Sequence, residues 1–120
     1  MCAGKVRVRP CWNTVSAQRR RSVAVVQYQL VDVFASAPYR GNSLTVFPDA
    51  GELSAAQMAE ITGELRQFES IFLNPNGLQY HWQARIFDLF EELDFAGHPV
   101  IGAAAVLHHC LLYTSDAADE

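Results

Sequence analysis

The pattern of apolar and polar residues divides residues 23–107 into strands and two helices. Val23 to Phe34 is rich in Val, Tyr and Phe, which is typical of a strand. Segments containing Pro, Gly and Asn separate the predicted elements. Further strands are predicted at Ser43–Phe47, Ser70–Leu73 and Tyr80–Phe87, with a short extended run at Leu89–Phe95.

The first predicted helix has a clear start signal. Ser54 can serve as the N-cap, and Gln57 three residues later completes a capping box. Met58, Ile61 and Leu65 follow at helical spacing. We therefore expect a helix from about Ala55 to Leu65.

The second predicted helix begins near Pro99, because proline tolerates the first helical position. Every residue from Pro99 to Leu107 is apolar or glycine, and a helix that is apolar all round is expected to be buried. Its first turn carries free N–H groups, which favour an anionic group in front of them. His98 lies at this position and can transfer a proton, hold an anionic group, or only cap the helix. The whole pattern predicts strands around this apolar helix, with the first helix outside.

The charge is unevenly distributed along the 120 residues, of which half are hydrophobic. Residues 1–21 contain six basic and no acidic residues, whereas residues 22–109 contain three basic and ten acidic ones, a local balance of −7. An acidic folded part argues against nucleic acid as a partner. No apolar run is long enough to span a bilayer. Cys2, Cys11 and Cys110 lie outside the patterned region, so we expect no disulfide framework and a reducing cytoplasm.

The two ends of the chain differ from the patterned region. Residues 1–22 have no sustained period and contain an arginine triplet. We favour their interpretation as a mis-called start that reads non-coding sequence in frame; a transit peptide and a nucleic-acid-binding arm are the alternatives. Residues 110–120 match, codon by codon, the translated adapter of a transposase-based sequencing library. We therefore expect residues 23–109 to form the domain and the gene to be cut short.

Four short motifs stand out along the chain: Tyr28–Phe34 with Pro38–Ser43, Leu53–Leu65, Phe68–Phe72 and Phe95–Ala104. In turn they resemble the VDVF…P(F/Y)xGNP signature, the first helix, the SETxF motif and the FAGHPTxGAA motif of the PhzF family, the phenazine-biosynthesis isomerase-like proteins. Each motif alone is weak, but their order and spacing together are specific. The resemblance runs from about Val25 to His109 and covers the N-terminal half of the family.

The resemblance implies an α+β fold related to diaminopimelate epimerase. In this fold, two similar domains each wrap a curved, mostly antiparallel sheet around a central apolar helix, and the active site lies between the domains. The family catalyses proton transfer without a cofactor or metal, and its name-giving member isomerises a dihydro-hydroxyanthranilate. The family's catalytic carboxylate falls on Glu69 and its motif histidine on His98. Asn42, Gly97 and Ser70 fall at positions expected to bind substrate.

The residues around Glu69 are compatible with that role. Phe68, Ile71 and Phe72 make an apolar setting, in which a buried carboxyl can accept a proton and return it near neutral pH. An edge-strand carboxylate in solvent is the alternative on the residues alone. Phe68 replaces a serine common in the family, and Asp88-Leu89 replaces a Thr-Pro pair, so the substrate can differ.

Other polar groups carry no site prediction. Glu91, Glu92 and Asp94 are typical of a solvated face. His81, His108 and His109 do not have the spacing of a metal site.

For the parent protein we expect a cytoplasmic isomerase that acts on a small carboxylated metabolite. Its full-length form is expected to be a homodimer, without nucleic-acid or membrane partners. The present chain, as one domain of two, is expected to have little activity and to expose an apolar strip. An amino-acid-type epimerase or racemase on the same scaffold is one alternative. A non-catalytic binding or self-association protein is the other.

Overall fold

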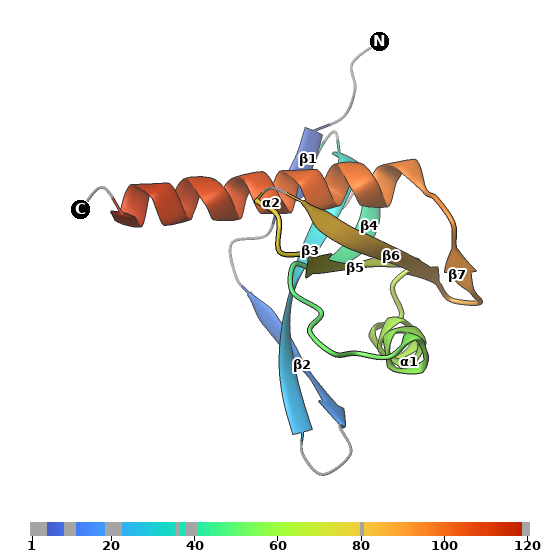
Figure 1. The fold of residues 1–120 in the computed structure, drawn as a ribbon. Helices are drawn as coiled ribbons and strands as arrows, with labels where there is room; N and C mark the ends of the chain where they lie inside the picture. The colour runs from blue at the N-terminus through green and yellow to red at the C-terminus, as the bar shows by residue number, and fades with distance from the viewer. Residues whose placement is uncertain are drawn as a thin grey trace.

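The computed structural model describes residues 5–8, 12–18, 23–35, 37, 41–79 and 81–118. Within them, seven strands form a sheet in the order β1-β3-β4-β5-β6-β7, with β2 also paired to β3. Two helices lie on opposite faces of this sheet (Figure 1). The predicted α+β class is confirmed. The elements are β1 Lys5–Val8, β2 Asn13–Gln18, β3 Val23–Ala35, β4 Asn42–Phe47, α1 Ala55–Leu65, β5 Glu69–Pro75, β6 Trp82–Asp88, β7 Glu92–Leu93 and α2 Gly97–Ala118.

The sheet is mostly antiparallel, as predicted. The described strand pairs are antiparallel except for β4 and β5, which run parallel. A parallel pair needs a crossover connection, and α1 provides it. In the register of this pair, Leu44 lies beside Glu69 and Thr45 beside Ser70.

Alternating side chains build a separate core on each face of the sheet. On the α1 face, Phe47 stacks on Phe72 with ring centroids 4.3 Å apart, and Phe87 meets Phe72 edge-on at 5.7 Å. The α2 face carries the neighbouring positions of the same strands, which are Val46, Ile71 and Ile86. Because the side-chain period is two, Glu69 shares the α2 face with Ile71.

Helix α1 has the predicted boundaries. The amide of Gln57 donates to Ser54 Oγ at 3.2 Å, and Gln57 Oε1 accepts from the amide of Ser54 at 3.0 Å, so the capping box is complete. The helix ends at Leu65, and its C-cap residue, Arg66, adopts a left-handed conformation with φ 53°.

Helix α2 is longer and less buried than predicted. It begins at Gly97, two residues before Pro99, and its backbone continues to Ala118. Ala103 and Val106 are buried against the sheet, whereas Val100 and Ile101 are 40% and 42% exposed. The expectation of a helix buried all round is therefore wrong, because the described sheet covers one of its faces. Neither helix of the described residues combines the length and hydropathy needed to cross a membrane.

The predicted domain boundaries at residues 22 and 110 stay predictions. β1 and β2, which both precede residue 22, pair with β3. Helix α2 continues through residue 110 without interruption. The origin proposed for these two segments stays a prediction. Part of the first motif, at residues 38–40, and the cysteines Cys2 and Cys11 lie outside the described residues.

We predict that Gly102→Ala destabilises the domain, because a Cβ at this position would clash with Leu44 Cδ2. Leu44 is fully buried and cannot move away freely. Overpacking of this kind is expected to lower the free energy of unfolding by about 1–3 kcal/mol. The matched control is Gly63→Ala in α1, where a Cβ would meet nothing within 4 Å. It should raise stability by up to about 1 kcal/mol in urea denaturation. Equal effects of the two changes would contradict this packing.

A bidentate ion pair joins β6 to β7. Arg85 Nε donates to Glu92 Oε1 at 2.7 Å and Arg85 Nη2 donates to Glu92 Oε2 at 2.8 Å. These hydrogen bonds lower the pKa of Glu92 below its usual value and raise the pKa of Arg85. Since both side chains are exposed, the pair is worth less than about 1 kcal/mol.

We predict that Glu92→Gln lowers stability at neutral pH and has a smaller effect in acid. A glutamate with a depressed pKa stabilises the fold above its ordinary pKa, and this contribution disappears as the pH falls through the folded-state value. Denaturation midpoints of the two proteins, measured from pH 7 downward, should therefore converge. A constant difference would show that the charge of Glu92 is not the cause.

Candidate active site

The two residues with the strongest catalytic chemistry meet at one end of the sheet. Glu69 is the first residue of β5, and His98 is the second residue of α2. Glu69 Oε2 lies 2.8 Å from His98 Nε2. β5 and α2 thus bring the predicted carboxylate and the predicted histidine into direct contact, although β6 and β7 lie between them in sequence.

The contact between Glu69 and His98 is buried, and the two contacting atoms lack well-aligned hydrogen bonds. The side chains are only 10% and 17% exposed, respectively. The two atoms are close enough for an ion pair, yet they are not aligned as a hydrogen bond. Neither atom has another hydrogen-bond partner among the described residues. A buried polar atom without such a partner costs about 1–3 kcal/mol, so the pair retains capacity to bind a ligand.

An open cavity of about 360 Å³ lies over this pair. Gly41, Asn42 and Ser43 line it from the start of β4, and Phe68 lines it from the turn before β5. Ser43 Oγ donates to Gln67 Oε1 at 2.5 Å, which ties the start of β4 to the residue before Phe68. The cavity therefore combines polar groups, an aromatic ring and an acid/base pair.

The structure brings together three of the five predicted site residues. Glu69, His98 and Asn42 line the cavity. Gly97 begins α2 beside His98 but does not line the cavity. Ser70 lies elsewhere: its hydroxyl is fully buried and hydrogen-bonds the hydroxyl of Thr45, on the α1 face. The alternation along β5 explains this placement, since Ser70 follows Glu69 within the strand and therefore points to the opposite face.

Sequence reasoning did not assign site roles to Gly41, Ser43 or Phe68. Their adjacency to Asn42 and Glu69 is the signal that could have found them. Glu91 and Asp94 are exposed, as expected. His81, His108 and His109 are also exposed, and the described residues contain no group of three side chains suited to a metal ion.

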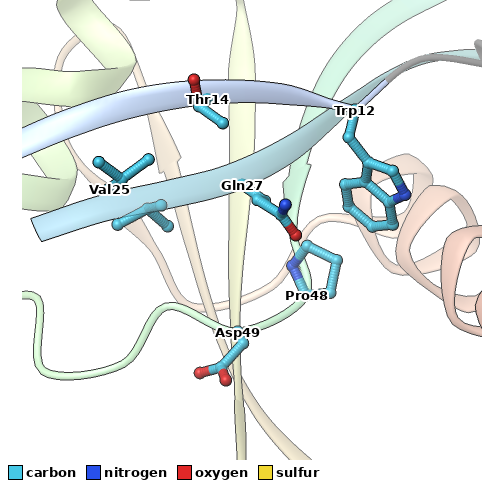
Figure 2. A pocket seen from close by; sticks show the side chains of 7 residues that line it. Trp12, Thr14, Val25, Gln27, Pro48 and Asp49 are labelled. Atoms are coloured by element: carbon cyan, nitrogen blue, oxygen red, sulfur yellow. The ribbon is translucent and has the colours of Figure 1, made fainter.

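A second cavity, of about 330 Å³, lies where the β2–β3 hairpin meets the end of β4. Figure 2 shows Trp12 and Pro48 beside Gln27, with Asp49 on the loop after β4. Asp49 Oδ1 already accepts a hydrogen bond from the amide of Gly51 at 3.1 Å. Because this cavity lacks an acid/base pair, we regard the Glu69–His98 cavity as the candidate active site.

Chemically, the Glu69–His98 pair can accept a proton and return it. A carboxyl and an imidazole in contact can share one proton and keep it near a bound ligand. The first turn of α2 adds N–H groups that favour a negatively charged substituent. The arrangement thus places an acid/base pair near groups that favour an anion.

The sequence model of the phenazine biosynthesis-like protein family matches residues 31–119. The chain belongs to this family. Its similarity to a trans-2,3-dihydro-3-hydroxyanthranilate isomerase of Pseudomonas chlororaphis is 47% identity over 81 residues. An uncharacterized isomerase of Pasteurella multocida is 44% identical over 85 residues. These matches cover 67% and 70% of the chain, but only 29% of each relative.

Solved structures of the family agree with the fold. A predicted epimerase from Pseudomonas aeruginosa is similar with a TM-score of 0.68 and 56% identity, over 71% of this chain and 30% of that one. A PhzF-family phenazine biosynthesis protein from Enterococcus faecalis gives a TM-score of 0.63 at 30% identity, over 68% and 31%. The described sheet and helices are thus the family's fold over slightly less than a third of its length.

We predict that Thr45→Val and Ser70→Ala each destabilise the domain by about 1–3 kcal/mol, because each leaves one buried hydroxyl without its partner. The double variant should cost clearly less than the sum of the two, since no hydroxyl then remains unpaired. Urea denaturation of the four proteins provides the measurement. Additive losses would mean that the two hydroxyls do not depend on each other.

Proposed function

We propose that this domain supplies the acid/base pair of a cofactor-free isomerase that acts on a small carboxylated metabolite. The contact of 2.8 Å between Glu69 and His98 beneath an open cavity supports it most strongly. Two of the relatives that the chain matches are named isomerases. Since the chain spans 29% of these relatives, we further propose that the active protein is longer and completes the cavity with its remaining part.

In this proposal, Glu69 removes a proton from one carbon of the substrate and His98 holds the resulting carboxyl in position. The electron pair of the broken C–H bond moves into the adjacent unsaturated system. Glu69 then returns the proton to another carbon, so that no atom or electron is gained or lost. The N–H groups at the start of α2 orient the substrate's carboxylate.

The separation of the two groups favours an isomerase over a two-base epimerase. An epimerase that inverts a carbon with two bases needs them on opposite sides of that carbon. Glu69 and His98 contact each other, so both lie on the same side of any substrate in the cavity. They therefore suit proton removal and return on one face.

An epimerase remains the second candidate, because the solved structure with 56% identity is titled a predicted epimerase. It requires an opposing base from another part of the protein. The two reactions give different signals, since inversion changes optical activity whereas isomerisation moves a double bond and changes ultraviolet absorption. A non-catalytic binding protein would give neither.

We predict that Glu69→Gln lowers turnover by about 100-fold or more in the complete protein, because the amide cannot accept the proton. The complete reading frame is first recovered by long-read sequencing across the codons for His109 and Cys110. Turnover is then followed by NMR, with trans-2,3-dihydro-3-hydroxyanthranilate as the first substrate, as its signals give way to those of the product.

The control for this prediction is Glu64→Gln. Glu64 is exposed on α1 and does not line the cavity, so its neutralisation should leave turnover unchanged. Unchanged turnover in Glu69→Gln would contradict the proposed role. If the reading frame ends at Glu120, the same assay applies to the present chain.

A further inference from the structure

Phe68 has an unusual place for a large apolar side chain. It is 67% exposed, whereas Glu69, the next residue, is 8% exposed, and both line the same cavity. An exposed aromatic ring gains free energy when a ligand covers it. The cavity thus presents an uncovered aromatic surface directly beside its buried carboxyl.

The segment that carries Phe68 is held in place from both sides. Gln67, the preceding residue, accepts a hydrogen bond from Ser43 Oγ at 2.5 Å, and its Nε2 donates to the carbonyl of Leu65 at 3.5 Å. Glu69, the following residue, begins the ladder with β4 and β6. The residues on each side of Phe68 are therefore anchored, which lowers the entropic cost of ordering this segment around a ligand.

The walls of the cavity differ in chemistry. Gly41, Asn42 and Ser43 provide peptide groups, an amide and a hydroxyl, whereas Phe68 is an exposed aromatic residue. A ligand that fits both walls carries a polar or charged substituent at one end and a planar apolar group at the other. A flat unsaturated ring stacks on Phe68 better than an aliphatic chain does, because offset stacking of rings adds to simple burial.

We propose that Phe68 is a specificity-determining residue and that its ring selects carboxylates with a planar, unsaturated ring over aliphatic carboxylates. This inference rests on the proposed function of the cavity as a substrate site. It adds a contact that is independent of proton transfer, since Phe68 has no acid/base group.

The chain offers a matched control for this proposal in Phe90. Phe90 is 91% exposed, lies in the loop between β6 and β7, and does not line the cavity. Phe68→Ser and Phe90→Ser remove the same side chain from two exposed positions. Phe68→Leu keeps an apolar group in the cavity but removes the aromatic face.

The test is a titration of the 120-residue chain with benzoate and with acetate, followed through backbone amide signals in NMR. The unchanged chain should bind benzoate about three- to tenfold more tightly than acetate, in line with one aromatic contact. The largest shifts should be at Asn42, Glu69 and His98. Phe68→Ser should abolish the preference, Phe68→Leu should reduce it, and Phe90→Ser should leave it unchanged.

Several results would overturn the proposal. They are equal affinity of the unchanged chain for the two probes, no binding of benzoate, and a preference that survives Phe68→Ser. Shifts confined to Trp12 and Gln27 would place benzoate in the second cavity and would also overturn it. The titration reads affinity, whereas the Glu69→Gln assay reads turnover. Failure of this inference is therefore distinguishable from failure of the proposed function.

Discussion

Helix α2 can approach β3 and β4 closely because residue 102 has no side chain, and the candidate site depends on this approach. Leu44 fills the space next to Gly102 and is also the register partner of Glu69. His98 precedes Gly102 by four residues, about one helical turn. The close contact between Gly102 and Leu44 therefore sets the distance between the His98 side chain and the Glu69 carboxylate. Any side chain at residue 102 would lift the helix and separate the two groups.

The Glu69–His98 pair carries an energetic cost in the absence of a ligand. Two polar atoms are buried without a well-aligned hydrogen bond, and protein interiors rarely tolerate this. The surrounding structure compensates with two well-packed cores, one on each face of the sheet. Sites of this kind lower the stability of the fold, and a ligand that hydrogen-bonds to the two buried atoms restores the lost free energy.

Local sequence signals predicted much of the fold. The capping box at Ser54 predicted the start of α1, and the helical spacing that runs to Leu65 predicted its end, since both signals lie within the helix itself. The extent of α2 and its exposed face were not predictable, because they depend on what packs against Val100 and Ile101 rather than on their own pattern.

Glu69, His98 and Asn42 came from motifs and do meet in space. Ser70 lies on the other face, because a motif gives adjacency in sequence, whereas strand alternation turns adjacent side chains to opposite faces. Phe68 stood out in the sequence only as a departure from the family motif.

The parallel pairing of β4 and β5 has a consequence for how the chain folds. Thr45 and Ser70, which meet across this pair, are 25 residues apart in sequence, so their contact requires closure of a long loop. Formation of α1 orders the middle of that loop and shortens the search. Ser54, an exposed residue far along the chain from His98, caps this helix. A helix that contributes no atom to the cavity is thus part of the connection whose closure brings Glu69 to its place.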